Sequence, residues 1–165
     1  MDRERVLAMT VHVCLADLPG LVDRPLGPTA PVRIDQRRID GFARCTLDEQ
    51  WIHVDPRRAA GGPFGTTIGH GFLTLSLLSH FFGELLAVDD AAMAINYGLD
   101  RVRFPAPVRS GSLVRARAQV RSVRPAAGHS TVQTRVTIRA DGLDKPCCVA
   151  DCVTRFVAPT TEAAA

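Results

Sequence analysis

One short segment of the chain holds the densest group of side chains capable of acid–base chemistry. It covers residues 46–55, with the sequence TLDEQWIHVD. Within it, Asp48 and His53 are five positions apart. A carboxylate and an imidazole that share one water molecule can remove a proton from it and return a proton elsewhere. The segment therefore predicts a catalytic pair. A structural role, in which Asp48 caps a turn and His53 fills a polar gap, fits the same spacing.

A second candidate feature is the run Gly69-His70-Gly71, where a strongly apolar helix is expected to begin. The first N–H groups of a helix have no partner inside it, and the helix dipole is positive there. Because Gly71 has no side chain, a carbonyl oxygen can approach its N–H, as in an oxyanion hole. The two glycines would equally allow a helix to start in tight packing, so both interpretations stand.

The elements around residues 46–55 are expected to be helical. Asp35 occupies an N-cap position, and the apolar spacing that follows predicts a helix over residues 36–45. Asp55-Pro56 is a second helix start, and the Gly-Pro-rich run at 61–63 ends that helix early. The segment between the two helices is therefore expected to be a loop or turn, which can fold Asp48 and His53 toward one point.

The rest of the chain predicts one long helix followed by a sheet. From His70 to Leu86 almost every side chain is apolar, which is typical of a helix buried on most sides. Alternating patterns then predict strands over residues 93–104, 113–123, 130–140 and 147–157. Short turns join the later strands, which favours antiparallel pairing. The expected fold class is α+β, with a buried helix against a long antiparallel sheet. A short helix at 15–24 and a strand at 32–34 precede it.

Composition narrows the function classes. The chain has 165 residues, a net charge of +3, one Trp and one Tyr, so a nucleic-acid partner is not expected. It contains no run of eighteen apolar residues, so no membrane helix is expected. The five cysteines include no CxxC pair and have no histidine close by, which predicts reduced thiols, no metal site and a cytoplasmic protein.

The motifs taken in order resemble a known family. Phe42-Ala43, the pattern Asp48-x₄-His53-x-Asp55, Phe64 and the run HGFL at 70–73 resemble the MaoC-like, (R)-specific enoyl-CoA hydratases. The run QWIHVDP at 50–56 looks like the branch that includes the nodulation protein N-like dehydratases. YGLDRVRFPAPV at 97–108 is similar to the strand that follows the central helix. The resemblance covers about residues 32–157.

That resemblance implies roles for individual residues. Asp48 and His53 would hold and activate water, and the N–H of Gly71 would polarise a thioester carbonyl. Ser79 matches a helix serine near the aspartate of some members, and Asp55 belongs to the same motif. The implied reaction is reversible hydration of a trans-2-enoyl thioester to the (R)-3-hydroxyacyl thioester. It uses coenzyme A or an acyl carrier protein as the carrier, and no metal or redox cofactor.

The family also implies an architecture, the hot-dog fold, in which the sheet wraps around the central helix and two protomers form a homodimer. We expect an arm at residues 1–31, the hot-dog domain at 32–158 and a disordered tail at 159–165. An acyl tunnel would run beside the helix. The candidates for lining it are Trp51, Phe64 and Phe72, and a plain core role fits them equally. The candidates for contacting carrier phosphates are Arg101 and Arg103, and a role as solvated surface arginines fits them equally.

The sequence departs from the family pattern at two points. Leu47 stands where glycine is common before the aspartate, and Gln50-Trp51 replaces the Asn-Pro of other branches. A bulky residue at position 47 bears on the turn that aims Asp48. Both departures concern substrate size and turnover more than fold.

Two other functions remain open from the sequence. A thioesterase of the same fold often uses a carboxylate on the central helix, and here the only one is Glu84. It lies thirteen residues beyond Gly71, about 20 Å along a helix, which is far from the helix start. A non-catalytic acyl-binding or assembly subunit is the third interpretation. The presence of both Asp48 and His53 argues against it.

Overall fold

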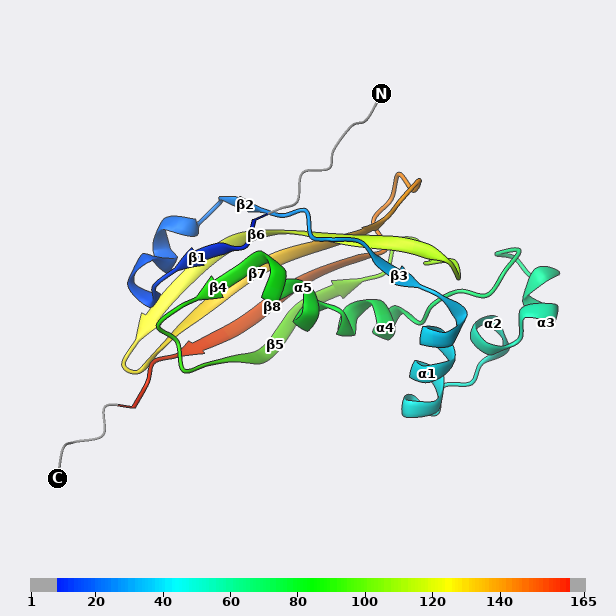
Figure 1. Ribbon diagram of the computed structural model, residues 1–165, viewed down its shortest axis with the longest axis horizontal. Coiled ribbons are helices and arrows are strands. Elements are labelled where there is room, and N and C mark those ends of the chain that lie inside the picture. The colour runs from blue at the N-terminus through cyan, green and yellow to red at the C-terminus, as the bar shows by residue number, and fades with distance from the viewer. Residues whose placement is uncertain (1–8, 161–165) are drawn as a thin grey trace.

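The computed structural model describes residues 9–160, and a long antiparallel sheet dominates it (Figure 1). The long strands are β5 (Met93–Arg103), β6 (Ser112–Ala126), β7 (His129–Ala140) and β8 (Cys148–Val157). The strand order is β2-β6-β7-β8-β5, and the short strands β2 (Pro25–Leu26) and β3 (Val32–Ile34) both pair with β6. The four strands expected between residues 93 and 157 are therefore confirmed.

Strand β7 shows why these residues form a sheet with one buried face. Its side chains alternate between buried and more exposed positions along most of its length. The buried face carries the small and branched residues Ser130, Val132, Thr134, Val136, Ile138 and Ala140. Such a period of two places one row of side chains in the core and the other row outside. This row packs into the hydrophobic core with the central helix.

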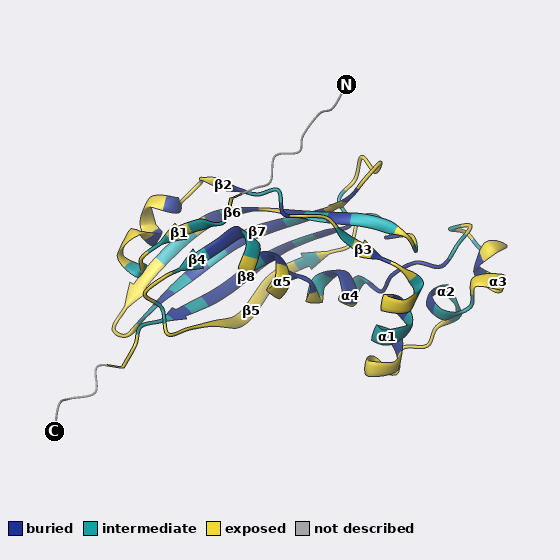
Figure 2. Cartoon of the chain, in the orientation of Figure 1, coloured by how far each residue is buried: buried dark blue, intermediate teal, exposed yellow. Residues whose placement is uncertain are grey.

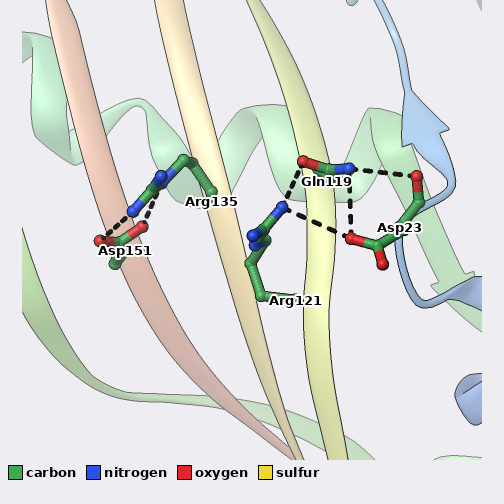
Figure 3. A network of polar contacts seen from close by, with 5 residues as sticks. All are labelled: Asp23, Gln119, Arg121, Arg135 and Asp151. Carbon is green, nitrogen blue, oxygen red and sulfur yellow. Dashed lines mark hydrogen bonds and ion pairs between the residues drawn. The ribbon is translucent and has the colours of Figure 1, made fainter.

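The outer face of the sheet is held by polar contacts (Figure 3). Arg135 on β7 makes two hydrogen bonds to Asp151 on β8, at 2.7 and 2.9 Å, and these lower the pKa of Asp151. Arg121 and Gln119 on β6 contact Asp23, which lies just before β2. Exposed ion pairs of this kind contribute at most about 1 kcal/mol each, so they mark the solvent face rather than stabilise the fold strongly.

The central helix has two parts, α4 (Gly71–Ser76) and α5 (Leu78–Leu85), with a break at Leu77. One uninterrupted helix was expected. Two hydroxyls account for the difference, because Thr74 donates to the carbonyl of His70 and Ser76 donates to that of Leu73. Such side-chain bonds compete with the helical ladder and bend it.

The central helix is also less enclosed than its sequence predicted. Its core-facing residues are buried among the strands; they are Leu73, Leu77, Leu78, Phe81 and Leu85. Phe72, in contrast, is 69% exposed. The expectation of burial on most sides was therefore wrong for one face of the helix, where Ser76, Ser79 and His80 are exposed as well.

The first described residues are tied to the sheet and helix. Strand β1 (Val11–Val13) pairs in parallel with β4 (Leu86–Val88), directly after α5. A 3₁₀ helix, η1 (Leu15–Leu21), follows and contains Pro19, where a short helix at 15–24 was expected. Residues 1–8 and 161–165, parts of the expected arm and tail, lie outside the described residues. The domain boundaries at 31 and 158 stay predictions.

Three short helices form a group beside one end of the sheet (Figure 1). They are α1 (Gln36–Thr46), α2 (Trp51–Val54) and α3 (Pro56–Ala60). Both predicted caps are confirmed, since Asp35 accepts from the N–H of Arg38 and Asp55 from that of Arg58. The segment expected to be only a loop or turn contains α2, because the N–H groups of His53 and Val54 both donate to the carbonyl of Gln50 and close one helical turn.

Two further features concern the surface and the thiols. Strand β5 is exposed along most of its length, as Figure 2 shows. Among residues 9–160, none of the helices is long and apolar enough to cross a membrane.

All five cysteines are free, and burial raises the thiol pKa of Cys148 to about 11 and that of Cys152 to about 12. The cytoplasmic location expected from the cysteines stays a prediction.

Candidate active site

Asp48 sits directly after the end of α1, on a turn set by its predecessor. Leu47 is the C-cap of α1 and adopts a left-handed conformation, with φ of 61° and ψ of 21°. That conformation explains why glycine suits this position, and it costs a residue with a Cβ atom about 1–2 kcal/mol. The Leu47 side chain is 86% exposed, so it does not crowd the site. The Asp48 carboxylate that follows is about half exposed.

His53 lies on α2 and is almost fully buried, at 7% exposure. Its Nδ1 is 2.7 Å from the carbonyl oxygen of Ile68. Because a carbonyl only accepts, Nδ1 carries the proton and Nε2 is left to accept one. Burial lowers the pKa of His53 from its ordinary value of 6.5; the hydrogen bond to Ile68 opposes this, His70 adds to it and Asp48 opposes it. The ring is therefore suited to act as a neutral base.

A glutamine, Gln36, connects the main chain of His53 to the segment that precedes the central helix. Gln36, at the start of α1, donates from Nε2 to the carbonyl of His53 and to Asp40, each at 2.7 Å. Thr67, which is fully buried, donates its hydroxyl to Oε1 of Gln36. Gln36 thus joins α2 to the segment whose Ile68 carbonyl orients the ring. The sequence offered no spacing signal for either Gln36 or Thr67.

His70 completes the site, although the sequence analysis gave it no role of its own. It is 2% exposed, and its ring stacks on that of His53 with centroids 3.7 Å apart and planes 24° from parallel. Its Nε2 is 2.9 Å from the main-chain oxygen of Asp48. One nitrogen or oxygen atom from each of Asp48, His53 and His70 lies within 4.8 Å of the others. Its position beside Gly71 in the HGFL motif was the available signal.

Two histidines and a carboxylate are also a set of metal ligands, but their arrangement does not suit an ion. An imidazole lone pair lies in the plane of its ring. Two stacked rings therefore point their lone pairs side by side rather than at one centre. A metal would need both nitrogens about 2.0–2.1 Å away. The geometry favours hydrogen bonding and proton transfer.

Gly71 follows His70 at the first position of α4, where a helix leaves its N–H without an internal partner. A Cβ atom built there would come within 2.9–3.1 Å of the ring of Phe104, just after β5. A real Cβ rarely approaches other atoms so closely, so any other residue at position 71 would force the Phe104 ring to shift. The packing role considered for Gly71 is therefore present, and its N–H is at a helix position that has no partner inside the helix.

A cavity of about 350 Å³ begins one residue beyond Gly71 and runs between the central helix and strands β5 and β8. Clefts of this size accept small-molecule ligands. Its wall is mainly apolar, apart from a hydrogen bond of 3.0 Å from Asn96 Nδ2 to Ser79 Oγ. The lining residues from the helix include Phe72, Leu75, Ser76, Leu78, Ser79 and Phe82.

The other predicted site residues lie elsewhere. Trp51 packs under the guanidinium of Arg58, 4.5 Å from the ring centroid, and Phe64 is half-buried after α3; neither lines the cavity. Asp55 caps α3. Of the two arginines on β5, Arg103 donates to the carbonyl of its own neighbour Val102. Arg101 is exposed, and its charge contributes to the low pKa of Asp151.

Comparison with known proteins gives a consistent result. Residues 17–141 match the MaoC like domain family. The chain is 48% identical over 152 residues to 3-hydroxyacyl-thioester dehydratase Z of Mycobacterium tuberculosis, covering 91% of this chain and 100% of that protein. It is 43% identical over 146 residues to nodulation protein N of Rhizobium leguminosarum, covering 87% and 91% of the two chains.

Solved structures agree on the fold. The (R)-hydratase from A. caviae involved in PHA biosynthesis superimposes with a TM-score of 0.65 at 25% identity, covering 82% of this chain and 96% of that one. The expected hot-dog architecture, a long antiparallel sheet packed on a central helix, is confirmed.

Proposed function

Because the chain belongs to the MaoC-like dehydratase family, we propose that it adds water reversibly to a trans-2-enoyl thioester, giving the (R)-3-hydroxyacyl thioester. The observation that carries this proposal is the meeting of Asp48 and His53 beside the start of the central helix. Relatives named as a dehydratase of 3-hydroxyacyl thioesters and as an (R)-specific enoyl-CoA hydratase support the same reaction.

The proposed chemistry follows from the protonation states at the site. In the hydration direction, a water held by Asp48 and His53 gives up a proton to Nε2 of His53 as its oxygen bonds to C3. The Asp48–His53 pair then returns this proton to C2, so one H and one OH are added across the double bond and His53 is neutral again. Negative charge that develops on the thioester oxygen is stabilised by the N–H of Gly71. Protein groups alone carry these steps, without a metal or redox cofactor.

The cavity beside the central helix is proposed to hold the acyl chain. It starts at Phe72, next to Gly71, and its wall is mainly apolar. A thioester carbonyl at Gly71 would therefore place the acyl chain between the helix and strand β5. The carrier, coenzyme A or an acyl carrier protein, would stay outside. Arg101 and Arg103, both exposed on β5, are proposed to contact its phosphates.

We also propose a homodimer formed through β5. This strand ends the sheet, and both of its faces are exposed along most of its length. Its large apolar side chains Met93, Ile95, Tyr97 and Leu99 are all exposed. An edge strand with these properties is a template for pairing with another chain. Two-fold pairing of β5 with its own copy would extend the sheet and use the same surface on both protomers.

The first experiment mixes the protein with crotonyl-CoA and follows enoyl-thioester absorbance, with a free-thiol assay in parallel. Loss of absorbance without thiol release, with the (R)-3-hydroxy product, is expected. Thiol release would instead identify a thioesterase. The structure does not favour that activity, because the carboxylate of Glu84 is already engaged by the N–H of Ala30 and by His80. Tight binding without turnover, on longer chains and carrier-protein thioesters as well, would identify a binding subunit.

A further inference from the structure

The two buried histidines of the site are held as different tautomers by main-chain carbonyls. His53 is bonded through Nδ1 to Ile68, whereas His70 is bonded through Nε2 to Asp48. Since a carbonyl accepts only, each bonded nitrogen carries a proton. Neutral His53 therefore has a bare Nε2, and neutral His70 has a bare Nδ1. The first can accept a proton from water, whereas the second is buried without a hydrogen-bond partner.

The ring of His70 is enclosed on its polar edge and on one face. Its Nδ1 is buried without a hydrogen-bond partner among the described residues, and its ring centroid lies 3.7 Å from that of His53. A buried polar atom without a partner costs about 1–3 kcal/mol, so its presence calls for an explanation. Phe42 packs on the same ring at 5.0 Å. The His70 ring is thus enclosed between Phe42 and His53.

The main chain at Asp48 needs a stabilising contact from elsewhere in the fold, because the turn before it is strained. Leu47 adopts the left-handed conformation without being glycine. Such a conformation persists where surrounding contacts determine it. The hydrogen bond from His70 Nε2 to the Asp48 carbonyl is a contact of this kind, made by a side chain that is itself buried. It connects the start of the central helix to the turn that carries the carboxylate.

We propose that His70 is a positioning residue of the active site: its Nε2–H fixes the main chain of Asp48, and its ring covers one face of His53. This inference rests on the proposed hydration reaction. His70 does not act on the substrate in this proposal. It places the carboxylate and the base so that both reach one water, and it keeps solvent from the base.

Two variants separate the two contributions. His70→Phe keeps an aromatic ring against His53 but loses the N–H to Asp48. His70→Gln keeps an amide N–H donor but uncovers the face of His53. We expect His70→Phe to lower kcat about 10- to 100-fold, the scale expected for misplaced catalytic groups, with KM nearly unchanged. The acid limb of its pH–rate profile should stay close to its position, because the phenyl ring keeps His53 buried and burial is the main cause of its lowered pKa.

His70→Gln should instead move the acid limb to higher pH, because burial is the main cause of the low pKa of His53. The titratable groups that act on His53 are Asp48 and His70, and Asp40 binds the other side of Gln36. Both variants retain Asp48 and Asp40. His80→Gln, at an exposed histidine of α5, is the matched control and should leave kcat and the profile unchanged.

Unchanged kcat and an unmoved acid limb in both folded variants would overturn the proposal, and so would a loss confined to KM. If either variant fails to fold, nuclear magnetic resonance of the imidazole nitrogens in the unmodified protein decides. His70 must be the Nε2–H tautomer and His53 the Nδ1–H tautomer, and the reverse assignment for His70 contradicts the proposal. This measurement needs no turnover, so it separates failure of the positioning role from failure of the hydratase function.

Discussion

At the scale of single residues, the site assigns different tasks to groups of similar chemistry. His53 has its Nδ1 engaged and its Nε2 available, whereas His70 has its Nε2 engaged. Asp48 differs from both because its carboxylate is about half exposed and can meet a water that enters from solvent. The main-chain carbonyls of Ile68 and Asp48 therefore decide which imidazole is the base. The residue types alone do not.

Asp48→Asn tests the carboxylate directly. The amide keeps the size of the side chain but cannot act as a base, so hydration of crotonyl-CoA should fall by about 10²- to 10⁴-fold, the usual contribution of general acid–base catalysis. The melting temperature should stay close to that of the unmodified protein, since the side chain is half exposed. Glu49→Gln, at the exposed neighbouring carboxylate, is the control. An unchanged rate in Asp48→Asn would remove Asp48 from the mechanism.

The pH dependence follows from the direction of the His53 shift. Burial holds the pKa of His53 below 6.5, and the neutral ring is the active form. The rate should therefore be full above the ordinary pKa and fall as the pH drops through the lowered one. Stability should follow the same sign, because the unfolded chain takes up this proton at higher pH than the folded chain. Measurement of kcat/KM as a function of pH checks this prediction. An acid limb centred above pH 6.5 would contradict the lowered pKa of His53.

At the scale of elements, the site forms where three short pieces of the chain meet. The end of α1 carries Asp48, α2 carries His53, and the segment before α4 supplies His70. Polar bonds hold them together: Gln36 reaches the His53 carbonyl, and Thr67 reaches Gln36. A short helix such as α2 has little stability of its own, so these bonds determine its position.

Thr67→Val tests that connection. Valine has nearly the same shape but no hydroxyl, so the half-buried Oε1 of Gln36 loses the donor that buried Thr67 supplies. Leaving such an acceptor unsatisfied costs about 1–3 kcal/mol, and the free energy of unfolding should fall by that amount. Denaturant titration measures it, and kcat should fall as well because α2 is less well held. Thr66→Val, one residue earlier, should change neither. Equal effects of the two substitutions would contradict this role.

The elements also show which parts of the fold can be predicted from sequence. The caps at Asp35 and Asp55 and the alternation in β7 are local patterns, and each is present in the structure. The pairing of β1 with β4 was not predictable, because two three-residue strands far apart in sequence carry no periodic signal. The stacking of His70 on His53 depends on that kind of long-range placement too. The sequence therefore pointed to Asp48, His53 and the start of the central helix, but not to the second imidazole.

At the scale of the whole molecule, the two edges of the sheet differ: the edge at β2 is covered, whereas the edge at β5 is exposed. The β2–β6 side is closed by short strands and by the polar contacts of Asp23. Strand β5, on the other side, leaves apolar side chains and one row of main-chain groups uncovered. The molecule thus has a single long edge suited to a second copy of itself among the described residues.

Ile95→Lys tests that edge. A charged side chain in the apolar row of β5 should prevent apolar packing between copies, so light scattering after gel filtration should show a monomer where the unmodified protein gives a dimer. Leu143→Lys is a matched control, since Leu143 is 39% exposed and Ile95 is 43% exposed, but Leu143 lies in the turn after β7. A dimer that persists in Ile95→Lys would place the interface elsewhere.

Strand β5 contributes Asn96, Gly98 and Leu99 to the wall of the cavity while its free edge faces outward. Ligand occupancy on one side of the strand and association on the other would therefore share a structural element. By thermodynamic reciprocity, an acyl group that favours one arrangement of β5 would strengthen self-association, and self-association would tighten acyl binding by the same factor. Preference for chain length would then depend on protein concentration, and so would belong to the assembly rather than to one chain.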